Sequence, residues 1–172
     1  VTDRKQCGGE FLKTVQTLAG QGLKTIILRE KDLSEEEYGE LAARCMEICR
    51  KAGASLTLHK YFHAACGLGA DRIHLPYPVF RENAGKIDQH IHVSTSIHAP
   101  GEAVEAERMG AEFVIAGHIF QTDCKKGVPP RGLEFLRETV QSVSIPVYAI
   151  GGITPYNIGD VLDTGAAGGC MM

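Results

Sequence analysis

The residues best suited to chemistry lie in one stretch of the chain, AEFVIAGHIFQTDCKKG at positions 111–127. Its apolar run at 113–116 is too short for an ordinary helix and predicts a buried strand. His118 stands where that strand should end, and the loop beyond it carries Thr122, Lys125 and Lys126. An imidazole there could move a proton beside an anion attracted by the paired lysines. The alternative is a strand-end histidine that only hydrogen-bonds to the backbone.

Composition limits the class of protein. The chain has 172 residues, 44% of them hydrophobic and 23% charged, which indicates one globular domain rather than disorder. A net charge of −3 argues against nucleic acid as the main partner. No apolar run is long enough to span a membrane, and the start lacks a signal-peptide pattern. Six cysteines without a CxxC pair favour a reduced, cytoplasmic protein. The sequence leaves open whether the protein forms a homo-oligomer.

The elements that must position His118 alternate along the whole chain. Eight short apolar runs have the character of strands: residues 1–2, 24–28, 54–58, 72–75, 90–95, 113–116, 146–150 and 166–172. Amphipathic stretches separate most of them, and Ser34 with Glu37 predicts a capping box. Pro76 and Pro78 argue against a helix directly after the fourth run. We expect Thr154-Pro155 to cap the helix after the seventh.

Eight strands alternating with helices predict a parallel sheet buried on both faces. Eight is the count of a (β/α)8 TIM barrel, here a single domain over residues 1–172 with its final helix missing. A doubly wound open sheet is the alternative. Active sites of barrels gather on the loops after the strands, so one bowl could hold the residues at predicted strand ends: Arg29, His59, Ser96, His118 and Gly151.

Two of these strand ends suggest anion binding. Gly151-Gly152 follows the seventh strand, where backbone N–H groups and a helix dipole could hold a phosphate, although Gly-Gly is often only a turn. Arg29 could pair with a substrate carboxylate in bidentate geometry, or with its neighbour Glu30.

Several segments carry a resemblance to a known family. VTDR (1–4), LREKDLS (28–34), GADRIHL (69–75), RGLEFL (131–136) and IPVYAIGGITPYN (145–157) resemble the thiamine phosphate synthase/TenI superfamily. Within it, GHIFQTDCKKG (117–127) is similar to the TenI branch, the thiazole tautomerases, because synthases usually carry proline in the position of His118. This resemblance implies a TIM barrel and an isomerase that aromatises a carboxythiazole phosphate in thiamine biosynthesis, with His118 as both acid and base. It implies no cofactor.

The same resemblance implies a set of ligand contacts and an alternative function. We expect eight residues to contact a thiazole phosphate: Arg29, Lys31, His59, Ser96, Thr122, Lys125, Gly151 and Gly152. Synthases bind a pyrimidine diphosphate with magnesium, using aspartates after strands three and four. Here those places read His59-Lys60-Tyr61 and Leu75-Pro76-Tyr77, so we expect no metal site. Thiamine phosphate synthase is the alternative enzyme, and a regulatory phosphate-binding barrel is the non-catalytic one.

Overall fold

The structure is a computed structural model that describes all 172 residues. The chain divides into two compact units, one of residues 1–74 with Met172 and one of residues 75–171.

The first unit alternates helices with parallel strands. Its elements are a 3₁₀ turn at Arg4–Cys7, α1 (Phe11–Gly20), β1 (Thr25–Leu28), α2 (Glu35–Ala52), β2 (Ser55–His59), α3 (Phe62–Gly67) and β3 (Arg72–Pro76). β1 pairs with β2 from Thr25 opposite Ser55 to Leu28 opposite Leu58. β2 pairs with β3 through Leu58 and His59. The strands are apolar and buried after their first residue, as expected for a parallel sheet.

Helix α2 fixes the ends of two strands. Ser34 and Glu37 form the predicted capping box, and the helix buries a stripe that includes Tyr38, Cys45 and Cys49. The Tyr38 hydroxyl donates to the carbonyl of Leu28 and accepts from the N–H of His59, both at 2.7 Å. One buried side chain therefore ties the helix to the carboxyl ends of β1 and β2.

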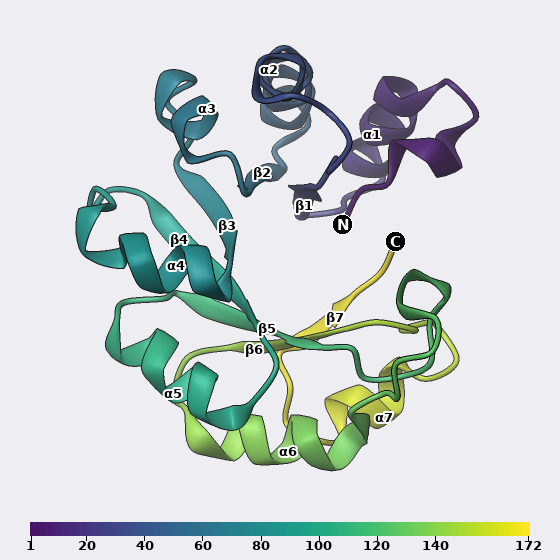
Figure 1. Cartoon of the computed structure of the whole chain (residues 1–172). Coiled ribbons are helices and arrows are strands. Elements are labelled where there is room, and N and C mark those ends of the chain that lie inside the picture. Colours follow the sequence, from purple (N-terminus) through teal and green to yellow (C-terminus); the bar gives the residue numbers. More distant parts are fainter. The chain divides into compact units, whose positions relative to one another are not determined.

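The second unit repeats the same alternation, and Figure 1 shows its helices lying along one face of its strands. Its elements are α4 (Tyr77–Asn83), β4 (His92–Ile97), α5 (Pro100–Arg108), β5 (Phe113–Gly117), α6 (Gly132–Ser142), β6 (Val147–Ile150), α7 (Ile158–Leu162) and β7 (Gly168–Cys170), with 3₁₀ turns at Ala84–Lys86 and Asp123–Lys125. The four strands are parallel neighbours in chain order. Val114 and Ala116 of β5 are fully buried, which makes the strand before His118 part of the core.

Three details of the prediction were wrong. Val1–Thr2 forms no strand, so there are seven strands rather than eight; the N–H of Thr2 donates to the carbonyl of Ile27, and the chain then enters the 3₁₀ turn. Helix α4 follows Pro76 directly, because Pro78 occupies the first turn, where a proline costs no hydrogen bond. Thr154 closes a turn with Asn157, and α7 begins only at Ile158.

No helix combines the length and the apolar character needed to cross a membrane. All six cysteines are free, with Cys45 and Cys49 buried and Cys66 and Cys124 exposed.

Candidate functional site

His118 lies directly after β5 and is only 5% exposed. Its Nε2 is 3.3 Å from the carbonyl oxygen of Val128, and its own carbonyl accepts from the N–H of Arg131 at 2.9 Å. Because a carbonyl oxygen only accepts, Nε2 must carry a proton to make this contact. The histidine thus joins the strand end to the far side of the loop that it begins.

The glycine pair after β6 packs against the same loop. Gly151 and Gly152 have φ of 97° and 66°, which other residues rarely adopt. A Cβ on Gly151 would lie 2.3 Å from the Cβ of His118, and one on Gly152 would lie 2.5 Å from the carbonyl oxygen of Gln121. Close packing therefore explains why both positions carry glycine. Their contact with a phosphate stays a prediction.

Sequence reasoning missed two residues at this edge. His98 follows β4 as His118 follows β5, and burial lowers its pKa, with Lys125, Arg131 and His118 adding to the effect and Glu102 opposing it. The Nε of Arg131 donates to the carbonyl of Gly117 at 3.1 Å. Lys125, Arg131 and His118 thus all act electrostatically on His98, beyond the end of β4. His98 was missed because the predicted strand ended at residue 95, whereas β4 runs to Ile97.

The remaining predicted residues of the second unit have different surroundings. Ser96 lies within β4, opposite Ile115 of β5. Thr122 caps the 3₁₀ turn, where its side chain accepts from the N–H of Cys124 at 3.4 Å. Lys125 ends that turn and is exposed, whereas Lys126 pairs with Asp123 at 3.6 Å. Their contact with a ligand stays a prediction.

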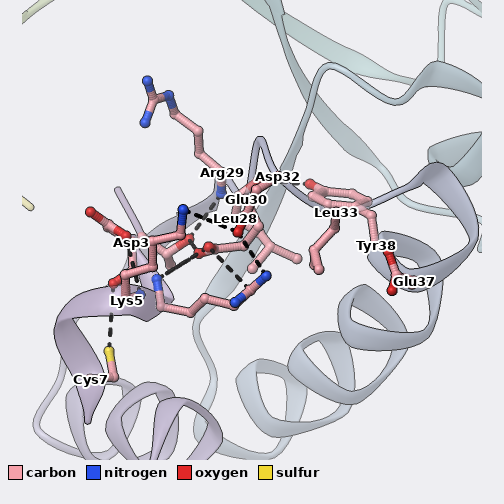
Figure 2. A network of polar contacts seen from close by, with 12 residues as sticks. Asp3, Lys5, Cys7, Leu28, Arg29, Glu30, Asp32, Leu33, Glu37 and Tyr38 are labelled. Atoms are coloured by element: carbon pink, nitrogen blue, oxygen red, sulfur yellow. Dashed lines mark hydrogen bonds and ion pairs between the residues drawn. The ribbon is translucent and has the colours of Figure 1, made fainter. Parts of the chain in front are cut away.

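In the first unit, Arg29 and Glu30 follow β1 and have separate partners. Glu30 is 4% exposed and accepts from the hydroxyl of Thr2 at 2.6 Å and from the N–H of Arg4 at 3.2 Å. The backbone N–H of Arg29 donates to the same Thr2 hydroxyl at 2.9 Å. In Figure 2 the side chain of Arg29 extends away from this network. Arg29 therefore makes no ion pair with Glu30.

His59 ends β2 as a buried, neutral ring. Its ring stacks on that of His74, with centroids 5.7 Å apart. Burial lowers the pKa of His59 to about 3, and the positive charges of Arg29, Lys31 and Lys60 lower it further. Burial likewise lowers the pKa of His74 to about 3. Both rings are therefore uncharged near neutral pH, each with one N–H and one lone pair. The contact of His59 with a ligand stays a prediction.

Comparison with known proteins identifies the family. A family model described as "Thiamine monophosphate synthase" matches residues 1–172. The chain belongs to the thiamine monophosphate synthase family. It is similar to a putative thiamine-phosphate synthase 2 from Aquifex aeolicus (36% identical, covering 98% of this chain and 91% of the relative) and to the thiamine-phosphate synthase of Syntrophomonas wolfei (35%, covering 100% and 84%).

A solved structure supports the family fold. The thiamine phosphate pyrophosphorylase from Pyrococcus furiosus matches with a TM-score of 0.82 and 30% identity, over 98% of this chain and 81% of that one. The prediction of an α/β fold of the TIM-barrel class is confirmed.

These relatives overturn the interpretation as a thiazole tautomerase. That interpretation depended on residues 117–127 and on His118 in particular, whereas relatives matched over nearly the whole chain are named thiamine-phosphate synthase. Similarity spread over every element outweighs one short loop motif. The leading functional prediction is therefore wrong, and its synthase alternative is the better one.

The residues present do not fit the magnesium ion that the superfamily resemblance implies for synthases. Mg²⁺ prefers carboxylate and water oxygens in octahedral geometry. The two positions that would supply aspartates carry Lys60, whose ammonium can only donate hydrogen bonds, and Pro76, which has no side-chain ligand. No group of three or more histidine, cysteine, aspartate and glutamate side chains is arranged to hold a metal ion.

Proposed function

We propose that this protein is a thiamine-phosphate synthase, a transferase that joins a pyrimidine diphosphate to a thiazole phosphate. The observation that carries the proposal is the similarity to proteins of that name at 35–36% identity, covering at least 98% of this chain.

The reaction is a substitution in which atoms and electrons balance without a redox cofactor. A bond forms between the thiazole nitrogen and the methylene carbon of the pyrimidine. The bond from that carbon to the diphosphate oxygen breaks, and the diphosphate leaves with the electron pair. The protein must position two anionic molecules and stabilise the negative charge that develops on the leaving group.

The chain's cationic side chains suit both tasks. We assign the diphosphate to Arg29 and Lys31 after β1, and the thiazole phosphate to Lys125 with the Gly151-Gly152 backbone after β5 and β6. The substitution requires no proton carrier at the thiazole ring. We therefore assign His118 a positioning role, through its contact with Val128.

The test is synthesis of thiamine phosphate from the two substrates, with release of pyrophosphate measured in parallel. We expect the two products in equal amounts. Arg29→Met should lower kcat/KM roughly tenfold to a hundredfold, because hydrogen bonds to charged groups contribute about 1.5–3 kcal/mol. Lys24→Met, an exposed lysine before β1, is the matched control and should retain wild-type activity. Absence of thiamine phosphate with both substrates present would reject the proposal.

A further inference from the structure

Three cationic side chains follow the first two strands of the first unit. Leu28 pairs with Leu58 in the sheet, so Arg29 lies one residue beyond that pair on β1 and Lys60 two residues beyond it on β2. Lys31 follows on the same loop as Arg29. All three lie close enough to the buried ring of His59 for their positive charges to lower its pKa.

Glu30 and Asp32 have ion-pair partners other than Arg29 and Lys60. Glu30 contacts Arg4, with 3.8 Å between Oε2 and Nε, and Asp32 pairs with Arg4 at 3.0 Å and with Lys5 at 3.2 Å. Figure 2 shows the Arg29 side chain directed away from the polar network around Glu30. Its guanidinium makes no hydrogen bond or ion pair.

The backbone of Lys60 has a conformation that lysine rarely adopts. Its φ is 72°, the only positive φ outside glycine in the chain, and its N–H donates to the carbonyl of His74 at 3.0 Å. Such a conformation disfavours any residue with a Cβ, and glycine would avoid the cost. The ammonium makes no ion pair and lies 4.8 Å from the ring centroid of Tyr61. The backbone of Lys60 is strained, and its ammonium charge is uncompensated. Because strained residues cluster at functional sites, this combination indicates that the ammonium group has a function.

We propose that Arg29, Lys31 and Lys60 bind the diphosphate group directly, and that the Lys60 ammonium supplies the positive charge which a magnesium ion would bring. The inference rests on the synthase activity proposed above and adds that diphosphate binding by this chain is independent of metal. A diphosphate ester carries roughly two to three negative charges near neutral pH, since the last ionisation of a terminal phosphate has a pKa of about 6. The three positive charges of these side chains balance the negative charge of the diphosphate. Together they would repel a divalent cation.

Calorimetric titration of the whole chain with inorganic pyrophosphate tests the inference. The wild type should bind pyrophosphate in excess EDTA, and added Mg²⁺ should not tighten binding. Lys60→Met should weaken binding roughly tenfold to a hundredfold, because one charged hydrogen-bonding group is lost. Lys60→Arg should restore most of the affinity, and Lys24→Met should bind as the wild type does.

A second variant separates binding from folding. Lys60→Gly removes the ammonium and also relieves the positive φ, so it should fold at least as stably as the wild type and still lose affinity. Wild-type binding that requires Mg²⁺, or unchanged affinity in both Lys60→Met and Lys60→Gly, would overturn the inference.

The synthase activity is judged separately by the formation of thiamine phosphate. Product formed only with Mg²⁺, by a protein that binds pyrophosphate only with Mg²⁺, would support the enzyme and overturn the metal-free site. Binding in EDTA that depends on Lys60, without any product, would support the site and reject the synthase.

Discussion

Replacing Tyr38 by phenylalanine should destabilise the protein far more than the loss of one hydroxyl suggests. Tyr38 is fully buried, and its hydroxyl both donates to Leu28 and accepts from the N–H of His59, at 2.7 Å each. Burial also raises the pKa of this phenol well above its usual value, so the hydroxyl keeps the proton that it donates. Phenylalanine fills the same volume but leaves both backbone groups without this partner.

The magnitude follows from the cost of unsatisfied buried groups. Each stranded donor or acceptor costs about 1–3 kcal/mol, so Tyr38→Phe should lower the free energy of unfolding by about 3 kcal/mol. Urea denaturation followed by circular dichroism measures this value. Tyr156→Phe is the matched control, because Tyr156 is 99% exposed and the change should stay within about 0.5 kcal/mol of zero. A loss below about 0.5 kcal/mol for Tyr38→Phe would refute the bridging role of the hydroxyl.

Two further predictions concern pH and backbone strain. His59 and His74 have folded pKa values of about 3, below the ordinary 6.5, so the unfolded chain takes up protons first as the pH falls. Stability is therefore fully present well above pH 6.5 and lost progressively towards pH 3, by roughly 3 kcal/mol at pH 5.5 for both rings together. Gly110→Ala should cost about 1–2 kcal/mol for its φ of 89° in open space. Gly151→Ala should cost about 1–3 kcal/mol more, because its Cβ would also overlap His118.

Both predictions have internal controls. His74→Gln should remove about half of the pH dependence between pH 7.5 and 5.5, because one of the two buried rings is lost. A wild-type stability that is flat over this range would contradict the buried neutral state of the two rings. Equal losses in Gly110→Ala and Gly151→Ala, measured by urea denaturation, would contradict the close approach of Gly151 to His118.

Features whose causes are local could be predicted from the sequence. The capping box of Ser34 and Glu37 spans four residues, and the helical stripe of Tyr38, Cys45 and Cys49 repeats at helical spacing. Seven of the eight predicted strands exist, because short segments rich in apolar residues between helical stretches suffice to indicate the strands of a parallel sheet. The superfamily was recognisable for a similar reason, since its motifs run through the whole chain. The branch was not, because that prediction depended on one loop.

Features whose partners are distant in the chain required the tertiary structure. An ion pair with its neighbour Glu30 was the alternative role of Arg29, but Glu30 binds Thr2 and Arg4, which lie 28 and 26 residues away. The positive φ of Lys60 is equally invisible in the sequence, because lysine seldom adopts it and only the path from β2 into α3 imposes it. Periodicity and capping act over one or two turns of chain, whereas the direction of a charged side chain is decided by the elements packed around it.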